Sequence, residues 1–396
     1  MLGHKIKMYR TLNGWSLEEL SQKVAEQGGK ISKVALSKFE RELINPSITN
    51  IKLLSEIFNV TMAELVVPQD YRVKHLGFRK KTSLPKSEQV RYQSIAEAEL
   101  EKVQWLTEKL SPMLTEKIDP GQFSIGSLDE VEIVAEKTRK IWELGEGPIF
   151  NLTSVMERNG YFLKPISGDE NFDAYSVVAE GKTGEFLTGM ILYNKNYTGD
   201  RQRFTLCHEL GHFLISTNEQ KLIEKSANRF ASAFLMSKSE TETIIGRKRS
   251  NITLTELQEY KKYFGVSIQA IIYRMKDLGI ISEQYAKEWY QSINRLGFKK
   301  KEPGAEIPKE IPEYLPNLIQ RAVAEGFLSR DAAKRRFGII TERDPNEQLS
   351  EIEKFMLLPK KERDRILTDQ AIAAREYYEN DEELREFREF DLDVFE

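Results

Sequence analysis

The chain has 396 residues, of which 40% are hydrophobic and 31% charged, with a formal net charge of −3. This composition is typical of folded domains, and the length predicts roughly two to four of them. Cys207 is the single cysteine, which excludes an internal disulfide framework and a cysteine-based zinc finger. The chain carries neither the apolar run of a signal peptide nor that of a membrane span, so we expect a soluble, cytoplasmic protein without a membrane partner.

Charge is distributed unevenly along the chain. Residues 1–91 contain sixteen Lys and Arg against nine Asp and Glu, a local charge of +7, whereas residues 342–396 contain nine against eighteen, a local charge of −9. The asymmetry favours an N-terminal part that faces nucleic acid and a C-terminal tail that serves a different function. Ordinary solvated surface is the alternative that charge alone leaves open.

Residues 1–67 predict five short helices around one core. Ser16–Glu19 and Thr61–Glu64 are capping boxes, and Ser32 is placed to cap a third helix that runs to about Arg41. The other helices are expected at Ile6–Leu12, Leu17–Ala25 and Ile48–Phe58. The expected core consists of Leu17, Leu20, Val24, Val34, Leu36, Ile51, Leu54, Ile57 and Leu65.

This stretch resembles the helix-turn-helix domain of the Cro/C1 (XRE) repressor family over its full length. The family pattern is found in Ser16-Leu17-Glu18-Glu19-Leu20-Ser21, Leu36-Ser37-Lys38-Phe39-Glu40-Arg41 and Asn45-Pro46-Ser47. The resemblance implies that the third helix reads a double-stranded DNA operator, and that the protein forms a homodimer. The side chains implied to face the major groove and its phosphates are Ser32, Lys33, Ser37 and Lys38.

Two departures from that family lie on either side of the third helix. The preceding turn is longer, through Gln27–Lys30, and Glu42 stands where the family usually has glycine. The operator sequence therefore cannot be deduced from the chain. A helical domain that serves protein–protein contacts is the alternative to a DNA reader.

Residues 68–91 are polar and basic, and we expect them to form a linker, with a short extended pair around Tyr71–Phe78. Helices are expected next at Ser94–Leu110 and Leu128–Trp142, and a third ends at about Asn159. Strand-like segments punctuated by glycine follow at Tyr161–Leu163, Ala174–Val178 and Met190–Asn194. A small sheet therefore precedes the next helical run.

That helical run contains an H-E-x-x-H motif, formed by His208, Glu209 and His212. Histidines four residues apart lie on one face of a helix and can bind one metal ion, beside a glutamate that can accept a proton from water. Two of the chain's four histidines fall in this motif. A hydrolytic zinc site needs a third protein ligand, for which Glu219, Glu224 and Asn228 are the candidates. Of these, Glu224 is favoured, because it stands in the first turn of the following helix.

The region from about residue 130 to 285 resembles the ImmA/IrrE family of metallopeptidases. The segments that carry the resemblance are Arg201–His212, Glu224-x-x-Ala227-Asn228-x-Phe230-Ala231, Trp142–Ile149, Tyr175-Ser176 and Phe264–Gly279. It implies Zn²⁺ held by His208, His212 and Glu224, with Glu209 as the general base, in a peptidase domain over residues 92–297. Ser237 departs from the family, which usually has proline there.

Other candidate residues receive weaker interpretations. Asn228 and Arg229 could supply an oxyanion donor, although Asn228 could equally brace its helix. Cys207 is expected in the core, and His4 and His75 lack the spacing of metal ligands. A zinc ion that only stabilises the fold is the alternative to a hydrolytic site.

The last hundred residues predict a linker and helices. A linker is expected at 298–311, a helix pair at 312–338 and a helix from Lys360 to about Tyr378. Beyond it, residues 382–395 alternate acidic with large apolar side chains, which favours folding onto a protein partner. The segment loosely resembles the toxin-binding tails of antitoxins, which implies a toxin as that partner. Packing on its own chain is the alternative for this tail.

The expected architecture is therefore multidomain, with an all-α helix-turn-helix domain, an α+β minimal zincin-like peptidase domain, and a helical C-terminal region over 312–396. The expected function is that of a DNA-binding transcriptional regulator whose zinc peptidase cleaves a regulatory protein such as a repressor or antitoxin. The alternative is a DNA-binding antitoxin or repressor whose zinc domain is a non-catalytic sensor or scaffold.

Overall fold

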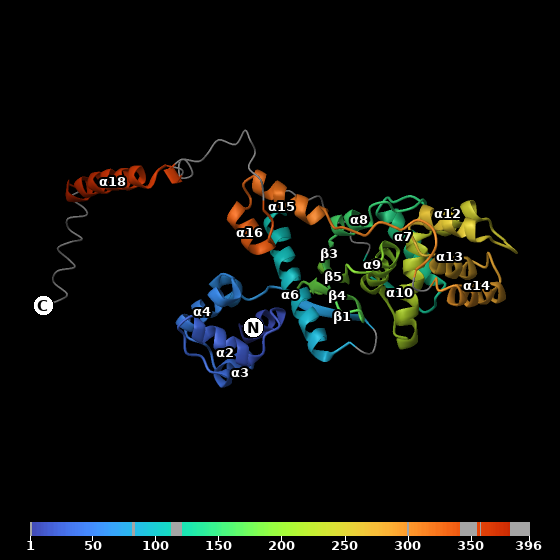
Figure 1. The fold of residues 1–396 in the computed structure, drawn as a ribbon, viewed down its shortest axis with the longest axis horizontal. Coiled ribbons are helices and arrows are strands. Elements are labelled where there is room, and N and C mark those ends of the chain that lie inside the picture. Colours follow the sequence, from blue (N-terminus) through green and yellow to red (C-terminus); the bar gives the residue numbers. More distant parts are fainter. Residues whose placement is uncertain are drawn as a thin grey trace. The chain divides into compact units, whose positions relative to one another are not determined.

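The computed structural model describes residues 2–80, 84–111, 121–298, 301–340, 355–356 and 358–380 (Figure 1). Its contacts divide the chain into two compact units, residues 1–341 and 342–396. The expected fold class is confirmed, because a helical N-terminal region is followed by a mixed sheet with helices and by further helices. No helix among the described residues is long and apolar enough to cross a membrane.

The N-terminal helices have the expected order and caps. They are α1 (Leu2–Leu12), α2 (Leu17–Glu26), α3 (Lys33–Glu40), α4 (Ile48–Phe58) and α5 (Met62–Val66). Ser16 and Thr61 form the two predicted capping boxes, and the Ser32 hydroxyl accepts a hydrogen bond from the Ala35 backbone N–H. These three helices, α2, α3 and α5, therefore begin where the sequence supplies a partner for unpaired backbone N–H groups.

The core of these helices agrees with expectation at every position except Val34. Val34 is 63% exposed on α3, because it lies on the face opposite the buried Leu36 and Phe39. Glu42 has a φ of 57°, so the position where glycine was expected does take a left-handed conformation. The turn therefore keeps the family geometry at the cost of some backbone strain.

A four-stranded sheet in the order β1-β4-β5-β3 forms the centre of the next region (Figure 1). Its strands are β1 (Arg72–Lys80), β3 (Tyr161–Ile166), β4 (Phe172–Glu180) and β5 (Phe186–Asn194). β4 is antiparallel to both β1 and β5, and β3 is parallel to β5. The linker expected over residues 68–91 is therefore wrong for residues 72–80, which form a strand, and for residues 86–91, which begin the next helix. The extended conformation expected around Tyr71–Phe78 agrees with β1.

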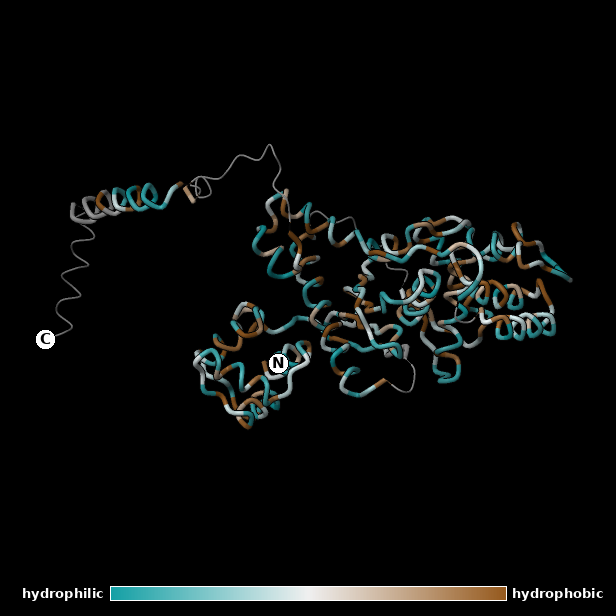
Figure 2. Tube along the Cα trace, viewed as in Figure 1, coloured by the Kyte–Doolittle hydropathy of each residue, from teal (hydrophilic) through white to brown (hydrophobic). Residues whose placement is uncertain are grey.

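Helices cover both faces of this sheet. Tyr175 and Val177 of β4 pack toward α6 (Lys86–Lys109), whereas Ala174 and Val178 pack toward α9 (Gly199–Leu214). Figure 2 shows hydrophobic (brown) and hydrophilic (teal) residues intermixed along the helices of the chain. The other elements of the region are α7 (Glu130–Ile141), α8 (Leu152–Arg158), α10 (Gln220–Leu235), α11 (Lys238–Ile245), α12 (Leu254–Phe264), α13 (Ile268–Asp277), α14 (Glu283–Arg295) and the short paired strands β2 (Phe123–Ser124) and β6 (Ile215–Ser216).

Residues 301–311 contain no helix or strand, but they are fixed to the surface of this region. Glu310 forms a nearly buried ion pair with Arg203 at 2.6 Å, and its carbonyl accepts a hydrogen bond from the Tyr193 hydroxyl. Glu302 accepts hydrogen bonds from Lys261 and from the backbone N–H of Ile268 at the start of α13. The described part of the expected linker 298–311 is therefore a docked arm, which a sequence without periodicity could not reveal.

The remaining helices are α15 (Tyr314–Ala324), α16 (Arg330–Phe337) and α18 (Lys360–Asn380). The first two are the predicted helix pair and share a small core with Leu106 of α6 and with Leu110, the residue that follows this helix. The third confirms the predicted helix from Lys360. The acidic segment 382–395 lies outside the described residues.

Candidate metal centre

The H-E-x-x-H motif lies on α9, which packs directly against α10. Gly211 permits this packing, since a Cβ atom there would lie 3.1 Å from the Cα atom of Ala227. The close approach brings the first turns of α10, including Glu224, opposite the histidine face of α9. The glycine within the motif therefore helps to bring the third candidate ligand to the two histidines.

His208, His212 and Glu224 converge on one point. The two Nε2 atoms are 3.1 Å apart, and the Glu224 carboxylate oxygens lie 3.5 Å from Nε2 of His208 and 3.6 Å from Nε2 of His212. Ligands bonded tetrahedrally to zinc at about 2.0–2.1 Å are about 3.3 Å from one another. The three side chains therefore fit a zinc ion, and among the described residues they are the one such His, Cys, Asp and Glu group.

Asn228 orients the first histidine. Its Oδ1 accepts a hydrogen bond from Nδ1 of His208 at 3.0 Å, and its Nδ2 donates to the backbone carbonyl of Glu224 at 2.9 Å. The first bond fixes the tautomer in which Nε2 of His208 has its lone pair free for a metal. Of the three roles considered for Asn228, the bond to Glu224 supports the one of bracing its own helix, and the bond to His208 adds a bracing role that the sequence did not suggest.

Glu209 is buried beside this group and is held by a strand residue. The Ser176 hydroxyl, in the middle of β4, donates a hydrogen bond to Oε2 of Glu209 at 2.5 Å. Both side chains are buried, whereas Glu224 is 69% exposed and leaves the centre open to solvent. The arrangement combines an oriented carboxylate with an accessible metal position, which is what a hydrolytic site requires.

A cavity of about 870 Å³ adjoins the centre. Thr205 and Phe204, one turn before the histidines on α9, line it together with Asn228. Tyr273 of α13 and Tyr290 of α14 supply an aromatic wall, and the docked arm closes another side. Burial raises the pKa of Tyr290 to about 12, so its hydroxyl stays protonated at neutral pH.

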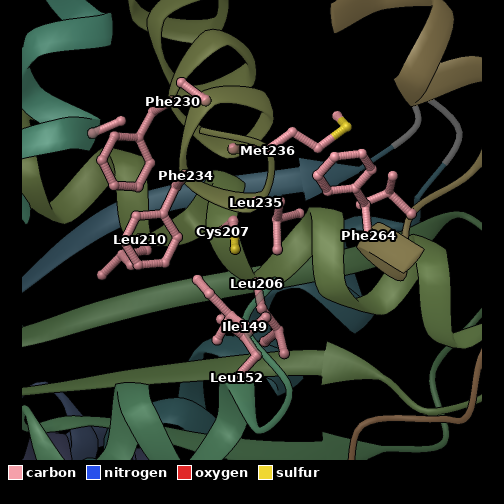
Figure 3. Packing of buried hydrophobic residues seen from close by; sticks show 14 of the residues in the cluster. Ile149, Leu152, Leu206, Cys207, Leu210, Phe230, Phe234, Leu235, Met236 and Phe264 are labelled. Atoms are coloured by element: carbon pink, nitrogen blue, oxygen red, sulfur yellow. The ribbon is translucent and has the colours of Figure 1, made fainter. Parts of the chain in front are cut away.

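The other candidates lie apart from the centre. Glu219 ends the loop before α10 and is absent from the metal-binding group. Cys207 points into the apolar core among Leu206, Leu210 and Phe234, as expected (Figure 3). Arg229 forms ion pairs with Glu132 and Asp277, which makes it part of a charged network between α7, α10 and α13.

The four residues predicted to contact DNA lie at α3. Lys33 and Lys38 are exposed, and Lys33 forms an ion pair with the exposed Glu18. The Ser32 hydroxyl is already engaged as the helix cap, and Ser37 is partly buried. The two lysines are therefore the better placed of the four for phosphate contacts.

Sequence reasoning assigned no role to Ser176, although it noted the Tyr175-Ser176 strand. A signal was present, because Ser176 is the one small polar residue within the run Ala174–Ala179. A polar side chain on the inner face of a buried strand needs a partner. Which partner it finds depends on the packing of α9, which the sequence does not specify.

Known proteins share both regions. Residues 6–65 match the family described as helix-turn-helix, and residues 168–276 match the family described as the IrrE N-terminal-like domain. The HTH-type transcriptional regulator SinR of Bacillus licheniformis is 37% identical over 71 residues, which cover 18% of this chain and 60% of that regulator. Both resemblances are thereby confirmed: the chain contains an XRE-type helix-turn-helix domain and a domain of the ImmA/IrrE metallopeptidase family.

Proposed function

We propose that this DNA-binding regulator is an active zinc peptidase that cleaves a regulatory protein, such as a repressor or an antitoxin. The observation that carries the proposal is the placement of Glu209, which adjoins His208 and is held by Ser176. A zinc ion that only stabilised a fold would have no use for an oriented carboxylate beside an open coordination position. Catalysis has a use for both.

The residues divide the chemistry between them. When bound to His208, His212 and Glu224, Zn²⁺ supplies the Lewis acidity that polarises a peptide carbonyl and acidifies water. Glu209 accepts the proton of the attacking water and delivers it to the leaving amine. Ser176 holds the Glu209 carboxylate in one orientation, and Asn228 does the same for the His208 ring.

The helix-turn-helix domain supports the choice of substrate class. A peptidase attached to an operator-binding domain is concentrated where other regulatory proteins bind. An extended peptide of such a protein could enter the cavity between α9, α13 and the docked arm. The acidic tail remains our candidate for contact with a further protein partner such as a toxin.

The proposal is tested by finding the cleaved bond. We would incubate the zinc-loaded protein with the products of neighbouring genes and sequence the new amino termini that appear. We expect one discrete cut in a regulatory protein, missing from the reaction with Glu209→Gln. Intact partners in every mixture, with operator binding retained, would favour the non-catalytic sensor or scaffold.

A further inference from the structure

The strand β1 joins the DNA-binding domain to the peptidase sheet. It begins a few residues after α5 and pairs with β4 along its whole length. In the register of this pair, Gly77 of β1 lies opposite Ser176 of β4, the residue that holds Glu209. A segment that leads out of the DNA reader therefore occupies the strand edge nearest to the general base.

Both edges of β4 are filled in this structure. On its other side, Ser176 lies opposite Ile191 of β5, a strand whose side chains are largely buried. Extended peptides gain backbone hydrogen bonds by adding to a free strand edge. β5 lies between β4 and β3 in the sheet, so β1 is the strand that can leave β4 without opening the core.

The outer edge of β1 is poorly suited to accept another strand. Lys74 is exposed there, and the pairing register shifts between His75 and Gly77, whose φ is 133°. Exposed lysines and bulges are features that prevent strand addition. A peptide that pairs beside Ser176 therefore has to take the place of β1.

Residues 72–77 of β1 are also less buried than the other strands of the sheet. Among residues 72–77, only the side chains of Val73 and Leu76 pack against a core, and each is partly buried. The Lys74–Glu180 ion pair, at 3.1 Å, is too exposed to contribute much stability. Strands with few buried contacts open locally at low free energy.

We infer that Arg72–Lys80 occupies the edge of β4 with which the substrate pairs, and that an extended segment of the substrate protein replaces Arg72–Lys80 on this edge. This inference rests on the proposed peptidase function and adds the site of substrate docking. The pairing of β1 thereby inhibits the peptidase until the strand leaves. The free energy of releasing β1 sets the fraction of molecules that can bind substrate.

The DNA-binding domain takes part in holding β1. The Glu97 carboxylate of α6 lies 2.8 Å from Nε2 of His4 on α1 and 3.5 Å from Nε2 of His75 on β1. Nδ1 of His75 is also hydrogen-bonded to the Tyr175 hydroxyl of β4. One carboxylate therefore contacts both the DNA reader and the inhibitory strand, so a shift of α1 affects the seating of β1.

Disulfide locks test the inference directly. Val73 lies opposite Ala179 and Arg79 lies opposite Ala174, so one cysteine pair can be introduced near each end of β1. Opposed residues of antiparallel strands have Cα atoms about 4.5–5.5 Å apart, within the range that a disulfide spans. The four substitutions Val73→Cys, Ala179→Cys, Arg79→Cys and Ala174→Cys are combined, and the same protein under a phosphine reductant is the matched control.

Binding is measured separately from cleavage. The probe is a proteome-derived peptide library. Retention of its peptides is measured on the locked protein in the Glu209→Gln background. Cleavage of its peptides is measured with the locked protein in which Glu209 is intact. We expect the oxidised form to lose binding and cleavage on the order of tenfold or more, and reduction to restore both. Leu76→Asp, which weakens the seating of β1 without a lock, is expected to raise both.

Each outcome tests either the inhibitory role of β1 or the proposed peptidase function. Equal binding by the oxidised and reduced forms, or no retained peptide even with Leu76→Asp, would overturn the role of β1. Cleavage unaffected by the locks would overturn it too, while supporting the peptidase. Binding that follows the locks without any cleavage would support the docking edge and contradict the peptidase.

Discussion

The Ser176 hydroxyl donates a hydrogen bond to Glu209 across the gap between β4 and α9. Glu209 lies next to His208 in the sequence, but its orientation comes from a strand residue 33 positions earlier in the chain. The sheet therefore does more than support α9, because it sets the direction of the carboxylate that we propose as the general base.

Removing this hydroxyl is expected to slow the reaction without weakening the metal site. In Ser176→Ala, the Glu209 carboxylate loses its fixed orientation, so kcat should fall about tenfold while KM and zinc affinity stay unchanged. Ser232→Ala is the matched control, because it removes a buried hydroxyl of α10 that has no hydrogen-bond partner in the described part of the chain. An equal loss in both variants would mean that the effect is general to the fold.

Asn228 is expected to act on metal affinity. In Asn228→Ala, the Nδ1–H of His208 loses its acceptor, and zinc affinity should fall about 10–100-fold, the usual effect of such a partner. Asn228→Asp keeps an acceptor oxygen and should retain most of the affinity. Competition with a chromophoric chelator measures both variants, and equal affinities in the two would contradict the bracing role.

The buried Glu157 predicts a pH dependence of stability. It lies on α8, and burial raises its pKa to about 7, although backbone N–H groups of Leu163, Tyr314 and Leu315 oppose the rise. The folded chain therefore keeps a proton that the unfolded chain releases above about pH 4.5. The free energy of unfolding should fall by about 3 kcal/mol as pH rises from about 4.5 to about 7, and no further above it.

Glu157→Gln isolates that contribution, because glutamine does not ionise. Urea unfolding at about pH 5 and about pH 8 should show a smaller loss of stability in this variant than in the wild type. Glu136→Gln, at an exposed position of α7, serves as the control and should follow the wild type. Parallel loss in all three proteins would exclude Glu157 as the source.

For DNA binding, the prediction concerns the two exposed lysines of α3. Lys33→Ala combined with Lys38→Ala should weaken operator binding and flatten its salt dependence, because fewer counterions are released. Lys262→Ala with Lys287→Ala removes the same charge from exposed positions of α12 and α14 and should leave both quantities unchanged. Unaltered affinity and salt slope in the α3 variant would contradict the assigned recognition helix.

Local sequence signals predicted the helices well and the tertiary contacts less well. α4 has the bounds expected from its flanking residues, since Ser47 caps it and Asn59 ends it in a left-handed conformation. The extended conformation of β1 was expected around Tyr71–Phe78, but its pairing with β4 was missed, because a strand held on one edge needs no regular alternation of apolar residues. The docked arm was missed because its binding depends on single contacts, such as that of Glu310 with Arg203, between residues far apart in the chain.

In the candidate site too, local sequence patterns predicted some residues, whereas tertiary contacts were not predicted. His208, Glu209 and His212 follow from helical spacing alone. Glu224 was favoured because it was expected in the first turn of its helix, and this reason is wrong, since α10 begins at Gln220 and Glu224 lies beyond its first turn. The choice of Glu224 over Glu219 agrees with the geometry, because the former converges with the histidines. Ser176 and the bracing role of Asn228 required the packing of α9 against β4 and α10, which no local pattern encodes.

The most direct test of the central claim compares the wild type with Glu209→Gln at equal zinc content. Zinc is measured in both proteins, and each is incubated with the regulatory protein in which the cut is found. We predict equal zinc, equal operator binding and loss of cleavage in the variant, because the substitution removes the general base and leaves the three ligands in place. Cleavage by Glu209→Gln at the wild-type rate would contradict the account.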